Sequence, residues 1–321
     1  MSLETFERLV TDLYEAGTRQ IDLVGRGEPL LNPHALEMIA CAAGRGMTVT
    51  MISNGSRLAE RVPGLVGAGL ARFRLSLDAG RASTYPKIHV SETAESYARV
   101  IAGLANLVRA RAGRAAPHVS ASFTIGALNY RELVEMIEVV SEVGADAAHF
   151  QHVIPLTPEG SATVLSASAR EELLRELVPA AAERARELGV ATNLRAFAAS
   201  QPPDPAGQEP VPCYVGSYFA VVLGNGNIMP CIQIERPVGS LRDSGFAQVW
   251  NSSPYREFRR AARRLPETSA PLETADCDRC YFRPHNVSVH NVVHPRARIR
   301  ERSEALLSVS HLVRMSRLDR R

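Results

Sequence analysis

QIDLVGRGEPLLNPHALEMIACAAGRGMTVTMIS, residues 20–53, holds an apolar run, a helix-forming stretch and a second apolar run. Glycines bound the first run, residues 20–24, which is typical of a strand buried in a parallel sheet. Apolar spacing predicts a helix over residues 33–44, and residues 48–52 predict the next strand. A strand, a helix and a strand in this order predict a right-handed crossover in a parallel sheet.

The same alternation extends on both sides of this unit. A helix is expected before it, over residues 2–16. After it, helices are expected over residues 58–67, 91–112, 130–143 and 167–188, and strands over 72–77, 119–124, 147–153 and 191–195. The pattern predicts an α/β fold with a parallel sheet, and it allows both a doubly wound sheet and a sheet curled toward a barrel.

Composition narrows the class of protein. The chain has 321 residues, of which 45% are hydrophobic and 22% charged, so it can bury a large core. No apolar run approaches the roughly 18 residues of a membrane helix, and the first residues lack the pattern of a signal peptide. A cytoplasmic protein with no membrane partner is expected. The net charge of +3 is concentrated after residue 295, where eight arginines face three acidic residues, so no nucleic-acid surface is expected.

The alternation stops near residue 200. Residues 201–212 contain five prolines, which predicts a linker. Beyond it, residues 217–222 and 228–234 flank Gly224-Asn225-Gly226-Asn227 and predict a hairpin. Residues 296–318 predict a basic amphipathic helix packed on the body, with docking to an acidic partner as the alternative.

The cysteines predict a metal site. Cys41 lies within a predicted helix and is expected to be a small buried hydrophobe. The other four are Cys213, Cys231, Cys277 and Cys280. Four thiolates can bind an iron–sulfur cluster or structural zinc. Zinc ribbons pair two CxxC knuckles, whereas seventeen residues separate the first pair here, which favours a cluster.

This spacing, with Gly226 and four further residues before Cys231, resembles the auxiliary-cluster motif of the SPASM and twitch domains of radical SAM enzymes. The longer SPASM motif continues with two more cysteines, and Asn286 and His290 stand at those positions. The resemblance therefore implies one auxiliary [4Fe–4S] cluster, as in the shorter twitch version, held by the four cysteines. His285, His290 and His294 are expected to be solvated loop residues.

The first half of the chain resembles the same family. Gly25-Arg26-Gly27-Glu28-Pro29 resembles the GGEP motif, whose glutamate holds the amino group of S-adenosylmethionine, although Arg26 departs from it. The carboxyl ends of parallel strands share one rim, where ligands bind. The residues implied to bind S-adenosylmethionine there are Gly25, Gly27, Glu28, Pro29, Ser53, Asn54, Ser76, Asp78, Asn129, Gln151 and His152. Arg195, expected at the end of the last strand, is a candidate catalytic residue.

The family binds its catalytic [4Fe–4S] cluster through CxxxCxxC after the first barrel strand, and this sequence contains no such triad. The resemblance implies a partial (β/α) TIM-like barrel over residues 1–199, whose first strand and cluster loop lie upstream of Met1. A linker over 200–212, a β-hairpin and helix twitch domain over 213–294 and the basic helix over 295–321 would follow. A longer native chain is favoured over one that has lost radical chemistry, because the positions facing S-adenosylmethionine are retained.

The resemblance implies an enzyme that uses S-adenosylmethionine-derived radicals to modify or oxidise a peptide or polar small molecule, served by an electron-donor protein. A second cluster would be present only with the upstream loop. The alternatives are a non-catalytic iron–sulfur subunit that presents a substrate to another enzyme, and a barrel stabilised by zinc.

Overall fold

The computed structural model describes residues 1–25, 27–154, 159–199, 211–265, 277, 280 and 282–295. The chain forms two compact units, of which one holds residues 19–198 and the other joins residues 1–18 to the part from residue 199 onward. The basic helix expected over residues 296–318 and most of the expected linker lie outside the described residues. The first eighteen residues, expected as part of the barrel, thus group with the C-terminal unit.

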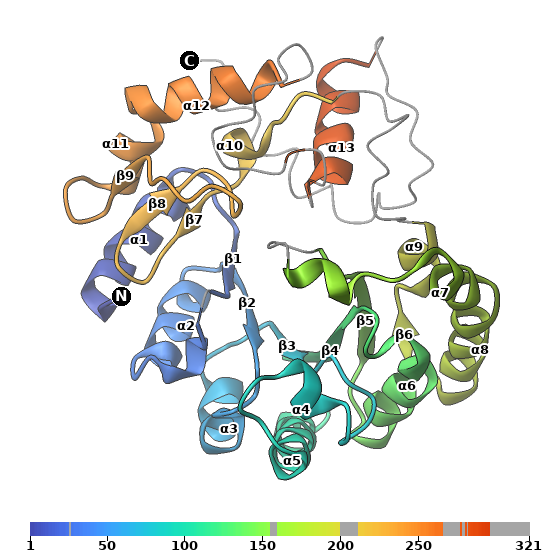
Figure 1. Cartoon of the computed structure of the whole chain (residues 1–321). Helices are drawn as coiled ribbons and strands as arrows, with labels where there is room; N and C mark the ends of the chain where they lie inside the picture. Colours follow the sequence, from blue (N-terminus) through green and yellow to red (C-terminus); the bar gives the residue numbers. More distant parts are fainter. Residues whose placement is uncertain are drawn as a thin grey trace. The chain divides into compact units, whose positions relative to one another are not determined.

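The larger unit is built on a parallel sheet (Figure 1). Its strands are β1 (Gln20–Leu23), β2 (Thr48–Ser53), β3 (Arg72–Ser76), β4 (His118–Ile125), β5 (Ala147–His152) and β6 (Ala191–Thr192). They are hydrogen-bonded in the order of the sequence, so every crossover steps in the same direction. A doubly wound sheet reverses direction at a switch point, so the sheet curled toward a barrel is the alternative that this chain adopts.

Helices cover the convex side of this sheet (Figure 1). The helices of this unit are α2 (Ala35–Gly44), α3 (Leu58–Gly67), α4 (Tyr85–Ile88), α5 (Ala94–Arg111), α6 (Leu133–Glu142), α7 (Ala167–Glu172), α8 (Val178–Leu188) and α9 (Leu194–Ala199). Short helical turns at Pro29–Leu31, Tyr130–Glu132 and Glu159–Thr163 lie in the loops between elements. The helix expected over 167–188 is interrupted by a π turn at Leu173–Leu177. Pro179 follows the π turn and has no backbone N–H to donate to the preceding turn of helix. The regular α-helical hydrogen bonding is therefore disturbed at this point.

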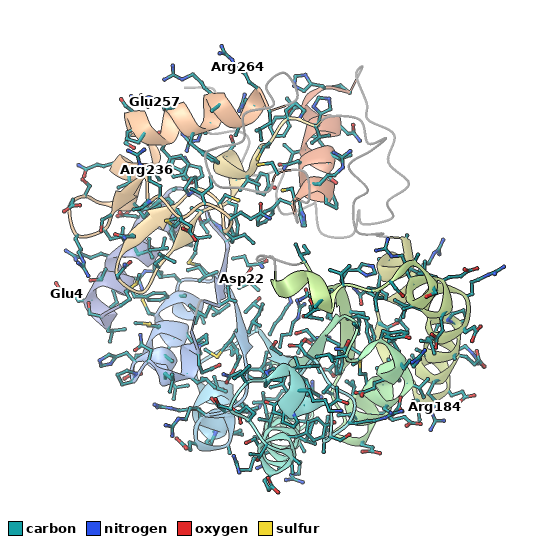
Figure 2. All side chains as sticks on the ribbon, in the orientation of Figure 1. Glu4, Asp22, Arg184, Arg236, Glu257 and Arg264 are labelled. Atoms are coloured by element: carbon teal, nitrogen blue, oxygen red, sulfur yellow. The ribbon has the colours of Figure 1, made fainter. Side chains whose placement is uncertain are left out.

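The strand register separates two faces of the sheet. On one face, Phe73, Phe123 and Phe150 are fully or almost fully buried, and the rings of the latter two stack at 5.5 Å. Successive side chains of a strand alternate between faces, so the residues between these aromatics lie on the opposite side. This side is called the polar face, and its members are Asp22, Thr50, Arg72, Arg74, Ser76, Ser120, Ser122, Thr124, His149 and Gln151. Figure 2 labels Asp22 on β1.

The smaller unit combines a three-stranded antiparallel sheet with helices from both ends of the chain. Its elements are α1 (Leu3–Glu15), α10 (Val215–Tyr218), β7 (Val221–Val222), β8 (Asn227–Met229), β9 (Gly239–Ser240), α11 (Phe246–Trp250), α12 (Ser253–Arg263) and α13 (Arg283–Val293). The predicted hairpin is formed by β7 and β8, with Gly226 at φ +90° in its turn. Its strands are shorter than expected, because residues 217 and 218 belong to α10.

Helix α1 has its apolar stripe in the core of the smaller unit. That core contains Leu9, Ile228, Phe246, Val249 and Tyr255, and Met1 and Leu13 pack against it. Phe6, Leu9 and Val10, spaced three and one residues apart on α1, are buried. Among the described residues, no helix has the length and apolar character needed to cross a membrane.

Candidate functional site

The ends of β1 and β2 bring three of the predicted residues together. Glu28 Oε1 accepts hydrogen bonds from Ser53 Oγ at 2.7 Å and from the amide of Leu30 at 3.0 Å. Its Oε2 accepts the backbone N–H of Asn54 at 2.8 Å. A carboxylate has about four acceptor positions. Among the described residues these three donors leave one position on Oε2 open, and that position suits an ammonium group.

The turn after β2 requires the glycine that follows Ser53 and Asn54. Gly55 has φ +77°, and a Cβ placed there would lie 2.6 Å from the Leu75 side chain and 2.9 Å from Val100. The Asn54 side chain accepts the amide of Ser56, so it caps this turn. The Ser-Asn-Gly sequence thus has a structural role at the same place as its predicted binding role.

The remaining residues of the GRGEP stretch lie in the loop after β1. Gly27 is exposed, and a Cβ added to it would meet no atom within 4 Å, so the space beside it is open. A Cβ on Gly25 would make ordinary contacts with Gly27. Pro29 begins a short helical turn that Glu28 caps. Arg26 lies outside the described residues.

The ends of β3 and β4 are joined by a buried polar network. Asp78 is 7% exposed and accepts Ser76 Oγ at 3.0 Å and the amide of Thr124 at 2.6 Å. Its own backbone carbonyl accepts Asn129 Nδ2 at 2.7 Å. Asn129 is also buried, and its Oδ1 accepts the amide of Gly126 at 2.8 Å. These predicted residues are therefore brought together, with their polar atoms engaged in holding the rim of the sheet.

Gln151 and His152 do not point the same way. Gln151 is exposed on the polar face and donates to Thr124 Oγ1 at 3.0 Å. His152 lies on the opposite face, where its ring stacks on Phe197 at 4.1 Å. The expected position of Arg195 at a strand end is wrong, because β6 ends at Thr192 and Arg195 is exposed on α9.

Glu132 belongs to the rim and was not identified from the sequence. It is 4% exposed, accepts the amide of Gly80 at 2.9 Å, and accepts the hydroxyl of Thr84. The backbone carbonyl of Gly80 in turn accepts Tyr97 Oη at 3.1 Å. Nothing in the local sequence distinguishes Glu132 from a solvated helix residue, since its partners lie 48 and 52 residues away.

The smaller unit brings the four predicted ligands to one apolar cluster, here named the cysteine core. It consists of Val215, Met229, Cys231, Ile234, Phe258, Ala262 and Phe282, with Cys213, Cys277 and Cys280 packed against it. Cys213 is fixed by its amide, which donates to the carbonyl of Ala262 in α12 at 3.1 Å. Two segments far apart in sequence thus deliver their thiols to the same place.

The electrostatics of these thiols favour a bound cation. Burial, together with the charges of the neighbouring Cys213, Cys231 and Cys277, raises the pKa of Cys280 to about 12. Burial also raises the pKa of Cys213 and Cys231. Four partly or fully buried thiolates repel one another, so metal charge is what stabilises the deprotonated set.

Neighbouring backbone groups partly offset the effect of burial on these thiols. Val215 lowers the pKa of Cys213, and Phe282 lowers that of Cys280. Ile232 and Gln233 lower the pKa of Cys231. Backbone N–H donors stabilise thiolates bound to iron. Within the described ranges, no three His, Cys, Asp or Glu side chains are arranged around a single metal ion. A [4Fe–4S] cluster instead offers a separate iron to each of four thiolates, which this donor set fits.

The three histidines near the CxxC pair were expected in a solvated loop, and this is wrong for two of them. His285 and His290 lie on α13 and are partly buried. Burial lowers the pKa of His285. His294 follows the helix and is exposed.

Family models match both units. The radical SAM superfamily model matches residues 1–140, and the SPASM model, an iron–sulfur cluster-binding domain, matches residues 213–281. The AdoMet-dependent heme synthase of Methanosarcina barkeri is 24% identical over 264 residues, which cover 75% of this chain and 71% of that protein. The AdoMet-dependent heme synthase of Nitratidesulfovibrio vulgaris is 23% identical over 316 residues, which cover 89% of this chain and 80% of that protein.

Solved structures agree on the fold. SuiB of Streptococcus suis superposes with a TM-score of 0.59 at 15% identity, covering 80% of this chain and 61% of SuiB. This chain thus spans about three fifths of the length of SuiB. The structure of anSMEcpe with bound AdoMet and Cp18Cys peptide superposes with a TM-score of 0.57 at 14% identity, covering 88% of this chain and 79% of that one. Both likenesses establish architecture alone.

Proposed function

Since the chain belongs to the radical SAM superfamily and carries a SPASM iron–sulfur domain, we propose that it serves S-adenosylmethionine-dependent radical modification or oxidation of a peptide or polar small molecule. The observation that carries the proposal is the convergence of Cys213, Cys231, Cys277 and Cys280 on the cysteine core. In this proposal they hold one auxiliary [4Fe–4S] cluster. With a cysteine for every iron, that cluster supplies a one-electron redox partner rather than a free iron site for substrate.

S-Adenosylmethionine is proposed to bind at the rim of the larger unit. Glu28 accepts a hydrogen bond from the ammonium group at the open position of Oε2. The Ser53 hydroxyl and the Asn54 amide donate to the Glu28 carboxylate and hold it in place. A charge-assisted hydrogen bond of this kind orients the ligand as well as binding it. Gly27, with open space beside it, leaves the backbone accessible to the ligand. The hydrogen bonds of Asp78 and Asn129 hold the ends of β3 and β4 together beside this proposed binding site.

The polar face supports a polar substrate. Arg74, Ser122 and His149 lie on it at neighbouring levels of three adjacent strands. Relatives of both substrate classes exist, since SuiB has been solved with the precursor peptide SuiA and the heme synthases are named for a small molecule. An electron-donor protein is part of the proposal, because radical formation consumes an electron.

A second candidate is a non-catalytic iron–sulfur subunit that presents substrate to another enzyme. The observation that favours it is the lack of CxxxCxxC in residues 1–321. The two candidates differ in the cleavage of S-adenosylmethionine. The protein is purified from its own host, its intact mass is measured, and the codons upstream of Met1 are translated. When this protein is reduced anaerobically and given S-adenosylmethionine, it is expected to yield 5′-deoxyadenosine. Iron-replete protein that yields none would reject the enzyme and favour the subunit.

A further inference from the structure

The exposed side of α12 carries a row of arginines. The buried side chains of this helix, which recur at helical spacing, are Tyr255, Phe258 and Ala262. The arginines exposed on the helix and its C-cap, here named the arginine row, are Arg256, Arg260, Arg263 and Arg264. Glu257 is the single acidic residue within residues 253–264, and Figure 2 labels it together with Arg264. The row therefore presents positive charge along about 12 Å of helix.

Two members of the row have no acidic neighbour to balance them. On α8, by comparison, Arg186 forms an ion pair with Glu183 of the same helix. Among the described residues, no acidic side chain lies within ion-pair distance of Arg256 or Arg260. Arg256 donates to the backbone carbonyl of Asn251, and Arg260 donates to that of Arg256, so their acceptors are neutral. The charge of these two guanidinium groups is thus directed at solvent or at a partner.

The contacts that fix α12 are made by an arginine outside the row. The guanidinium group of Arg259 lies over the Trp250 ring at 4.3 Å and over the Tyr255 ring at 4.5 Å. Its Nε donates to the carbonyl of Gly216 in α10 at 2.7 Å. The helix is therefore held against α10 and α11 without the exposed row.

The buried side of α12 belongs to the cysteine core. Phe258 and Ala262 are members of that core, and the carbonyl of Ala262 accepts the amide of Cys213 at 3.1 Å. A Cβ placed on Gly216 would lie 2.6 Å from the Phe258 ring, so the segment after Cys213 packs closely on the helix. Because a helix with its side chains is about 10–12 Å across, the arginine row lies about one helix diameter from the cysteine core.

The chemistry of α12 favours a protein partner over other anionic partners. Single strands of nucleic acid stack on exposed aromatic side chains, whereas Tyr255 and Phe258 are buried. A helix that binds an anionic membrane inserts its apolar face, and the apolar face of α12 lies in the core. Transient redox complexes bury little area and are steered by complementary charge, which a short basic row provides.

We propose that the arginine row is the docking surface for an acidic electron-carrier protein that reduces the auxiliary cluster. The inference rests on the proposed function, with its cluster at the four cysteines. One electron passes from the reduced carrier to the oxidised cluster, so the carrier is oxidised, the cluster is reduced, and no bond is formed or broken. Opposite charges speed the encounter of the two proteins and orient them.

The test measures how fast a reduced acidic [2Fe–2S] ferredoxin reduces the cluster of the anaerobically purified, iron-replete full chain in a stopped-flow experiment. The double variant Arg256→Glu with Arg260→Glu is expected to lower the second-order rate constant about 10-fold or more at low salt. The matched control, Arg8→Glu with Arg242→Glu, makes the same charge change at exposed positions of the same unit and should keep the wild-type rate. Reduced methyl viologen, a small cation, should reduce the row variant no more slowly than the wild type.

Salt provides a second measurement that needs no variant. Raising the ionic strength from about 0.02 to about 0.5 M should slow the reaction of the wild type with ferredoxin, because exposed charges are screened. Equal rates with ferredoxin in the row variant and the wild type would overturn the inference. So would a row that binds duplex DNA or anionic vesicles while the wild-type cluster accepts electrons from viologen but not from ferredoxin. A wild-type protein that binds no iron at the four cysteines would instead overturn the proposed function.

Discussion

Asp12 of α1 accepts the backbone amide of Phe246 at 2.8 Å, across 234 residues of chain. Phe246 is the first residue of α11, so its N–H has no partner within the helix. The carboxylate satisfies that donor and also places negative charge at the helix N-terminus, where it is stabilising. A side chain near the start of the sequence therefore helps to order the C-terminal unit.

Replacing Asp12 by alanine is expected to destabilise the smaller unit by about 1–2 kcal/mol, since the amide of Phe246 loses its partner. Trp250, the single tryptophan of the chain, stacks against Phe246 at 5.6 Å, and its fluorescence reports this unit selectively. Urea unfolding followed at Trp250 should show a lower midpoint. Asp243→Ala, an exposed change in the same unit, should leave it unchanged, and equal midpoints for both variants would contradict the assignment.

Replacing Cys277 and Cys280 together by alanine should remove the auxiliary cluster, because two of four thiolate ligands are lost. Iron analysis of anaerobically purified protein is expected to fall by about four irons per chain, and the brown colour to fade with it. Cys41→Ala is the matched control, since that thiol lies in α2 beside Arg45. Wild-type iron content in the double variant would refute the ligand assignment.

Glu28→Gln should weaken the binding of S-adenosylmethionine about 10- to 100-fold, because the variant loses the charge that attracts the ammonium group. Ser53→Ala should weaken this binding less, since the variant loses only the 2.7 Å hydrogen bond that orients the Glu28 carboxylate. Anaerobic equilibrium dialysis measures both effects. Glu37→Gln, at an exposed position on α2, should bind as wild type, and equal affinity in Glu28→Gln would remove the rim from the proposal.

His149 makes stability depend on pH. Burial, followed by the charges of Arg74 and His118, lowers its pKa to about 4. As the pH falls, His149 is protonated near pH 6.5 in the unfolded chain but only near pH 4 in the folded chain. The contribution of neutral His149 to stability is therefore fully present above about pH 6.5 and is lost as the pH falls from there toward about 4. Circular dichroism of urea unfolding should show about 2 kcal/mol less stability at about pH 5 than at about pH 7.

The same measurement on two variants assigns this loss. His149→Gln should flatten the pH dependence, because the titrating group is gone from the polar face. His34→Gln, at an exposed position, should keep the wild-type dependence. An unchanged slope in His149→Gln would assign the pH effect to other groups.

Periodicity predicted most elements of the larger unit, because most of them carry a local signal in the sequence. The helix over residues 58–67 and the start of β3 at Arg72 match the expectation, since apolar runs and glycine turns mark them. The partnership of α1 with α11 could not be read in this way. The apolar stripe of α1 predicts that the helix is buried, but no local pattern predicts which element it packs against.

The residues of the candidate site also differ in whether the sequence alone could predict them. Glu28 and the four cysteines stand in motifs with fixed spacing, so the sequence alone could single them out as candidates. The role of Glu132 depends on residues brought together by folding. Arg195 was misplaced because β6 has only two residues, and the apolar pattern after it belongs to a helix.

The division of the smaller unit between the two ends of the chain also governs how the protein is made. A ribosome releases α1 first, then the whole sheet of the larger unit, and only then the segment with which α1 packs. At roughly 5–20 residues per second, the apolar stripe of α1 waits on the order of 10–50 seconds for its partner. During that interval the stripe lacks the C-terminal residues that cover it in the folded unit, and a chaperone could protect it from aggregation.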